Sequence, residues 1–187
     1  SNTIKTDYAL SLNNLGFLYS TIGELAIAEK HLVRALEIRK NVLGEHHPDY
    51  AISLNNLGSH YSNIGNYTNA EKYYLHALNK IKEYSGENNL DYALCLNNLG
   101  ALYADISDYI QAEKCYLKAL DIRKHTLGVN HPDYAISLNN LGLHYSGISD
   151  YSEAEKYYLE ALELQKNILG ESYPNYAVSL NNLGTLY

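Results

Sequence analysis

The chain has 187 residues, of which 46% are hydrophobic and 19% charged, and its formal net charge is −7, from 14 Lys and Arg against 21 Asp and Glu. This much apolar sequence excludes bulk disorder, and the acidic balance argues against a surface for nucleic acid or anionic membranes. No apolar stretch approaches the roughly 18 residues of a membrane-spanning helix. We therefore expect neither nucleic acid nor a membrane as a partner.

A five-residue motif, Leu-Asn-Asn-Leu-Gly, recurs every 42 residues and begins at Leu12, Leu54, Leu96, Leu138 and Leu180. Four full periods leave 19 residues for the start of a fifth. An unbroken period indicates one structural unit stacked on itself. We therefore predict a single solenoid over residues 1–187, and we expect both of its ends to be cut from a longer array.

The first segment of each period predicts a helix. It begins near an aspartate, whose charge favours the positive start of a helix, and Leu54, Leu57, Gly58 and Tyr61 illustrate the spacing that shares one helical face. We predict starts near Asp49, Asp91 and Asp133, and ends near Gly23, Gly65, Ser107 and Ser149.

The second segment of each period predicts a longer helix. It starts around Ala28, Ala70, Ala112 and Ala154, and it ends at glycines placed as C-caps, Gly44, Gly86, Gly128 and Gly170. No useful length of sequence alternates with period two, so we predict no strands. The fold class is all-α.

A glycine lies inside each first helix, where it costs about 1 kcal/mol relative to alanine. It recurs at Gly16, Gly58, Gly100 and Gly142. We predict that two helices approach closely at these glycines. The alanine twelve residues later, Ala28 in the first copy, is the expected small surface on the second helix.

These residues resemble the tetratricopeptide repeat, whose pattern is matched in the first copy by Leu12, Leu15, Gly16, Tyr19, Ala28, Leu32 and Ala35. The 42-residue period and the His-Pro-Asp-Tyr-Ala linker at His47 are similar to those of kinesin light chains and many bacterial arrays, although leucine replaces the family's tryptophan at Leu12. The resemblance implies a right-handed superhelical solenoid of antiparallel helix pairs, with protein or peptide ligands in its concave groove.

The face of each first helix opposite the apolar stripe repeats along the chain. The resemblance implies that this face lines the groove. We predict that peptide binds to Leu10, Asn14, Phe17, Ile52, Asn56, Ser59, Asn63, Leu94, Asn98, Ala101, Asp105, Ile136, Asn140 and Leu143.

Two adjacent asparagines in every first helix indicate a use beyond filling space, because asparagine is a poor helix former. Asn56 and its equivalents point into the predicted groove, either as solvated residues or as a ladder of carboxamides that bonds a peptide main chain. The preceding asparagines either bond the adjacent first helix and fix the stacking, or reach the groove; they are Asn13, Asn55, Asn97 and Asn139.

The sequence offers no motif for chemistry. None of the eight histidines stands at metal-ligand spacing, and we expect His47 and His131, which precede proline, in helix N-cap regions. The thiols Cys95 and Cys115 are expected to be reduced, in a cytoplasmic chain. Because Cys95 replaces a serine of the other copies, we interpret it as drift. We predict no catalytic residue, metal or cofactor, and no enzyme activity.

The leading functional prediction is a peptide-binding scaffold. The alternative is a structural spacer, or a self-assembling segment of a larger protein that associates end to end. Lys and Arg lie outside the predicted first helices, with Lys5 just before the first of them. We therefore expect the groove to bind neutral or basic extended segments rather than acidic ones.

Overall fold

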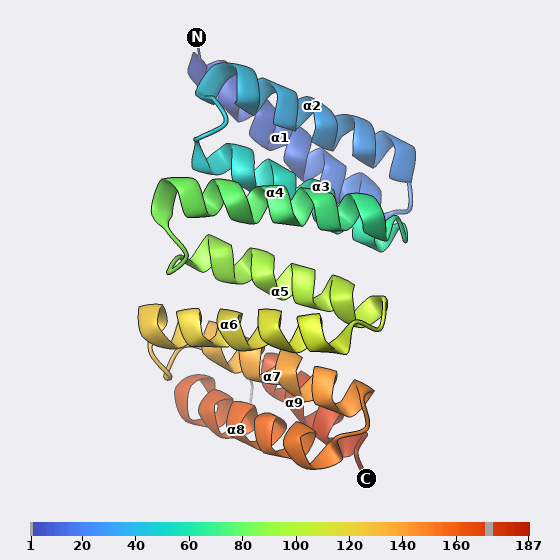
Figure 1. Ribbon diagram of the computed structural model, residues 1–187, viewed down its shortest axis with the longest axis vertical. Coiled ribbons are helices and arrows are strands. Elements are labelled where there is room, and N and C mark those ends of the chain that lie inside the picture. The colour runs from blue at the N-terminus through green and yellow to red at the C-terminus, as the bar shows by residue number, and fades with distance from the viewer. Residues whose placement is uncertain (1, 171–173) are drawn as a thin grey trace. The chain divides into compact units, whose positions relative to one another are not determined.

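The computed structural model describes residues 2–170 and 174–187, and helices make up most of this part of the chain (Figure 1). The helices are α1 (Asn2–Thr21), α2 (Leu25–Leu43), α3 (Pro48–Asn63), α4 (Tyr67–Ser85), α5 (Leu90–Asp105), α6 (Tyr109–Leu127), α7 (Pro132–Gly147), α8 (Tyr151–Leu169) and α9 (Pro174–Gly184). The described residues contain no strand, and the predicted all-α repeat fold is confirmed.

The chain forms two compact units, one ending at Asn98 and one running from Leu99 to Tyr187, so that α5 contributes to both. In the first unit, α1 packs on α2, α2 on α3, and α3 on α4. In the second unit, α6 packs on α7, α7 on α8, and α8 on α9. Within each unit, consecutive helices run antiparallel (Figure 1). Among the described helices, none has the length and apolarity needed to cross a bilayer.

The starts of α3 and α7 are fixed by a histidine and a proline. Nδ1 of His47 accepts a hydrogen bond from the backbone N–H of Asp49 at 3.1 Å, and His131 does the same for Asp133. The predicted N-cap position of both histidines is therefore confirmed. The first copy has no such proline, and α1 begins at Asn2, so the prediction that Lys5 precedes the first helix is wrong.

The second helices begin three residues before their predicted starts. In α4, α6 and α8 a polar side chain caps this earlier start, whereas α2 has no side-chain cap. Oδ1 of Asn66 accepts from the N–H of Asn69 at 3.3 Å, and Oδ1 of Asp108 accepts from that of Gln111 at 3.2 Å. These bonds satisfy amides that have no partner inside the helix. At the other end, Gly44 closes α2 with a φ of 87° and donates its N–H to the carbonyl of Lys40, as predicted.

The close approach at the internal glycines is confirmed. A Cβ on Gly58 would lie 2.6 Å from Cδ1 of Tyr74, and one on Gly142 would lie 2.5 Å from Cδ1 of Tyr158. The nearest neighbour is therefore the side chain sixteen residues later on the second helix. The alanine twelve residues later is among the nearest contacts only at Gly16, where a Cβ would lie 3.3 Å from the carbonyl oxygen of Ala28. The missing Cβ creates a notch that the tyrosine ring fills.

Gly142→Ala is expected to lower the free energy of unfolding by about 1–3 kcal/mol, because the new methyl group overlaps the buried ring of Tyr158. The matched control is Gly147→Ala in the same helix, where a Cβ meets no atom within 4 Å. The control is expected to be neutral or slightly stabilising. Urea titrations of both variants measure the difference, and equal midpoints would contradict the notch.

Buried polar pairs join the second helix of one repeat to the first helix of the next. Nη1 of Arg39 on α2 donates to Oγ of Ser53 at 2.8 Å and to the carbonyl of Asp49 at 3.1 Å. Arg123 on α6 makes the equivalent bonds to Oγ of Ser137 at 2.6 Å and to the carbonyl of Asp133 at 3.3 Å.

The intervening copy replaces this polar pair with an apolar one. Ile81 and Cys95 occupy the equivalent positions and are 2% and 0% exposed. A thiol is a poor acceptor for a guanidinium, and an isoleucine needs none. The Ile81 and Cys95 positions are thus both apolar where the flanking repeats have a bonded arginine and serine. That Cys95 is drift stays a hypothesis.

Ile81→Arg alone is expected to destabilise the protein by about 3–5 kcal/mol, because it buries a guanidinium without a good acceptor. Adding Cys95→Ser is expected to restore about 1.5–3 kcal/mol through a charge-assisted hydrogen bond. Chemical denaturation of the two single variants and the double variant gives the coupling energy. A coupling near zero would show that the two positions do not act as a pair.

Candidate functional site

A pocket of about 620 Å³ opens between α1 and α3 in the first unit. Seven of the residues predicted to bind peptide line it, together with Thr21: Leu10, Asn14, Phe17, Ile52, Asn56, Ser59 and Asn63. The face assigned to the groove on these two helices thus surrounds one cavity.

The walls of the pocket combine exposed apolar side chains with carboxamides. Phe17 is 74% exposed, Leu10 52% and Ile52 38%. Asn14 and Asn56 lie on the same two helices, and no hydrogen bond within the described residues engages their side chains. Such a surface offers both apolar contact and hydrogen bonding to a ligand.

The floor of the pocket consists of buried residues, two of which come from α2. Asn13, Leu32, Arg39 and His60 are each less than 7% exposed, and all four line the pocket. The groove residues were predicted from the first helices alone, so Leu32 and Arg39 were not among them. Both lie on the second helix α2, and their side chains line the pocket between α1 and α3.

The presence of Arg39 corrects the expectation that no cationic side chain reaches the groove. Within the described part of the chain, its guanidinium bonds a hydroxyl and a carbonyl but forms no ion pair. Burial lowers the pKa of Arg39, and the nearby charge of Asp49 partly offsets this. Asp7 and Asp49 also line the pocket, so two carboxylates accompany one guanidinium.

Burial favours the uncharged form of His60. Desolvation lowers the pKa of its imidazole, and the carboxylate of Glu29 opposes this shift only in part. Neither ring nitrogen of His60 has a hydrogen-bond partner. Both nitrogens are buried, and the ring packs edge-on against that of Tyr61, with the centroids 5.6 Å apart.

The other predicted groove residues are distributed over both units. In the first unit, Leu94 is 47% exposed, whereas Asn98 is half-buried and bonded to Asn55. In the second unit, Leu143 is 50% exposed; Ala101 and Asp105 are exposed, and Ile136 and Asn140 are half-buried. Their role in binding stays a prediction.

The asparagines that precede the groove positions connect neighbouring first helices. Oδ1 of Asn55 accepts from Nδ2 of Asn98 at 3.1 Å, and Nδ2 of Asn139 donates to Oγ of Ser179 at 2.5 Å. These two bonds agree with the stacking interpretation. Asn13 and Asn97 are also buried, but the Oδ1 of each has no partner.

Neither metal binding nor thiol chemistry is indicated by the residues described. They contain no cluster of three or more His, Cys, Asp or Glu side chains that could hold a metal ion. Burial raises the pKa of the Cys115 thiol to about 11, which leaves little reactive thiolate near neutral pH.

The fold defines the class: an all-α protein built from repeated helix pairs. The family model described as tetratricopeptide repeat matches residues 7–79, 54–125, 94–167 and 150–187. The chain belongs to the tetratricopeptide repeat family, as its motifs predicted. Members of this family are typically scaffolds for protein interactions. A search of curated proteins found no match.

Solved structures of similar fold cover nearly the whole chain. BtubC (BKLC) from P. vanneervenii is 25% identical with a TM-score of 0.86, over 98% of this chain and 73% of that one. A putative kinesin light chain of Podosopora anserina, with nearly identical TPR-like repeats, is 18% identical with a TM-score of 0.80, over 98% and 86%. The apo form of RapI is 19% identical with a TM-score of 0.75, over 100% and 49%.

Acidification from pH 7.5 to 5.5 is expected to destabilise the protein through its buried imidazoles. Desolvation lowers the pKa values of His60 and His144, so the unfolded chain takes up protons first as the pH falls below about 6.5. The stability present above that pH is therefore lost on acidification, by up to about 1.4 kcal/mol per imidazole and pH unit.

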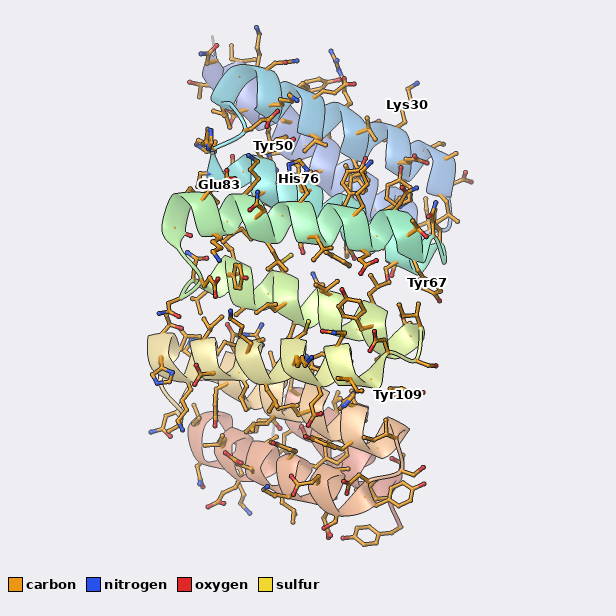
Figure 2. All side chains as sticks on the ribbon, viewed as in Figure 1. Lys30, Tyr50, Tyr67, His76, Glu83 and Tyr109 are labelled. Carbon is orange, nitrogen blue, oxygen red and sulfur yellow. The ribbon has the colours of Figure 1, made fainter. Side chains whose placement is uncertain are left out.

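Replacing His60 and His144 with leucine, the residue at the equivalent positions Leu18 and Leu102, is expected to reduce the dependence of stability on pH. Urea titrations at the two pH values measure it. His76, which packs edge-on against Tyr50 at 6.0 Å (Figure 2), also has a lowered pKa and remains in the double variant. An unchanged difference between pH 7.5 and 5.5 would show that His60 and His144 are not its source.

Proposed function

We propose that this protein is a scaffold that binds an extended peptide segment of a partner protein along its first helices. The observation that carries this proposal is the pocket between α1 and α3, where exposed apolar side chains alternate with unengaged carboxamides. Leu10, Phe17 and Ile52 provide apolar contact, and Asn14 and Asn56 provide main-chain hydrogen bonds.

The charges of the pocket favour a neutral or weakly basic segment. One guanidinium, on Arg39, already holds two hydrogen bonds, and two carboxylates, on Asp7 and Asp49, line the same pocket. A segment rich in Asp or Glu would lose its hydration and meet more negative than positive charge. Binding therefore depends mainly on hydrogen bonds and apolar contact, with weak sensitivity to salt.

The asparagines chosen for substitution must not form hydrogen bonds that join two helices. Asn98 donates to Asn55 and thereby joins two first helices, so its removal would disturb the packing as well as any ligand. Asn14 and Asn56 carry no such bond within the described residues and line the pocket. They are the appropriate pair for substitution.

Fluorescence anisotropy with labelled decapeptides of neutral, Glu-rich and Lys-rich composition, at low and high salt, measures this binding. The neutral peptide is expected to bind with little salt dependence. The double variant Asn14→Ala/Asn56→Ala is expected to weaken it by about 1–3 kcal/mol, or about 5- to 150-fold, at roughly 0.5–1.5 kcal/mol per net hydrogen bond.

Asn41→Ala is the matched control, because Asn41 is exposed on α2 and does not line the pocket. It is expected to leave the affinity unchanged. The proposal would be overturned if the Glu-rich peptide bound tightly, if its affinity depended strongly on salt, and if the Asn14 and Asn56 substitutions left that affinity unchanged.

A further inference from the structure

Helices α1 and α2 together form an open apolar surface on the side away from the groove pocket. A cavity of about 730 Å³ lies against these two helices, and Tyr8, Leu12 and His31 are among the residues that line it. Tyr8 is 54% exposed, and Leu15 on the same helix is exposed as well. We call the surface formed by Tyr8, Leu12, Leu15 and His31 the α1–α2 docking surface.

In the second unit the equivalent surface holds the preceding second helix. Tyr134, Leu138 and Ala161 form a buried cluster between α7 and α8, and Leu120 of α6 packs against this cluster. Tyr134 is the equivalent of Tyr8, and it is only 5% exposed. The exposed fraction of this tyrosine therefore differs according to whether a second helix covers it.

A leucine of the first helix differs in the same way. Leu141 on α7 packs on Ala112 and Tyr116 of α6 and is fully buried. Its equivalent on α1 is Leu15, which is exposed. The α1–α2 docking surface thus has the apolar residues that, in the second unit, receive a second helix.

Polar positions restrict which second helix fits this surface. Between repeats, Tyr61 donates its hydroxyl to Glu29, and Ser53 accepts from Arg39. The equivalents of this tyrosine and serine on α1 are Tyr19 and Ser11. A fitting helix carries a glutamate, a leucine seven residues later as in α6, and an arginine or glutamine three residues after that. These spacings place the three side chains on one side of a helix.

We propose that the α1–α2 docking surface binds helix α8 of a second copy of this chain, and that α9 of that copy is displaced. Helix α8 carries the required residues at Glu155, Leu162 and Gln165. In its own chain, Glu155 accepts from the hydroxyl of Tyr187, and Gln165 accepts from that of Ser179. The equivalent tyrosine and serine of α1 replace both donors in the exchanged complex.

The exchange gives α8 a more complete surface to pack against. In its own chain α8 packs on α9, where Leu180 is 46% exposed, whereas the equivalent Leu138 is 1% exposed between α6 and α8. The α1–α2 docking surface adds residues of α2 to those of α1. Helix α8 therefore buries more apolar surface there, and this gain opposes the entropy cost of association.

The contact is heterologous, because one copy supplies α8 and the other supplies α1 and α2. Each copy keeps one unused partner surface, so association extends beyond a dimer unless a ring closes. The groove pocket lies on another face of α1, with Leu10, Asn14 and Phe17. The inference is therefore independent of the proposed function.

Light scattering of the purified chain across a concentration series measures the association. The average mass is expected to rise at least about twofold. Leu15→Lys is expected to keep the chain monomeric, because it places a charge in the contact, while in the single chain it replaces an exposed leucine. Leu75→Lys, at an exposed leucine of α4, is the matched control and is expected to associate as the unchanged protein does.

Two further measurements identify α8 as the occupant. The Leu15→Lys chain still offers its α8, so adding it to the unchanged protein is expected to terminate the assemblies and lower their mass. The Leu75→Lys chain is expected to be incorporated without this effect. Amide hydrogen exchange in α9 of the unchanged protein is expected to become faster at high concentration, because α9 has left α8.

Each contrary result overturns the proposal. A monomer mass at every concentration shows that the α1–α2 docking surface does not bind a second copy. Association that persists in Leu15→Lys assigns the contact to another surface. A mass that stops at a dimer, with unchanged hydrogen exchange in α9, shows that two copies of the docking surface pair with each other instead of with α8.

Discussion

The notch at the internal glycine of α1, α3, α5 and α7 is the constraint on which the rest of the structure depends. Because Gly58 has no side chain, the ring of Tyr74 packs against the backbone of α3, and Gly142 and Tyr158 repeat this arrangement. Through this contact, one face of the first helix packs against the second helix of its own repeat. The opposite face, with Ile52 and Asn56, is then left to line a groove.

Polar contacts between adjacent repeats are made by pairs of side chains, one donor and one acceptor, that recur along the chain. Tyr61 donates its hydroxyl to Glu29 at 2.5 Å, Tyr145 does so to Glu113, and Arg39 bonds Ser53. The substitution of Ile81 and Cys95 for an arginine and a serine changes both members of a pair together. Since a buried guanidinium needs an acceptor, a copy paired with the wrong neighbour would bury unmatched groups.

The period, the helix pairs and the groove-facing side of the first helices could be predicted from sequence, because each follows from spacing on a single helix. The starts of the second helices were missed, since the caps at Asn66 and Asp108 depend on a local bond that apolar spacing does not reveal. Arg39 was missed for another reason. A long side chain on one helix reaches a pocket between two others, and this requires the three-dimensional packing.

Identical motifs acquire different roles through their neighbours. Asn13 and Asn55 occupy the same position of the Leu-Asn-Asn-Leu-Gly motif, yet Asn55 is bonded to the next first helix and the Oδ1 of Asn13 bonds nothing. The difference is therefore not encoded in the motif. It arises from which side chain the neighbouring first helix places beside each asparagine. Where a neighbour supplies a carboxamide, as Asn98 does for Asn55, the asparagine joins two first helices. The Oδ1 atoms of Asn13, Asn97 and Asn139 are buried without such a partner among the described residues, so the same motif position contributes differently to the packing of each repeat.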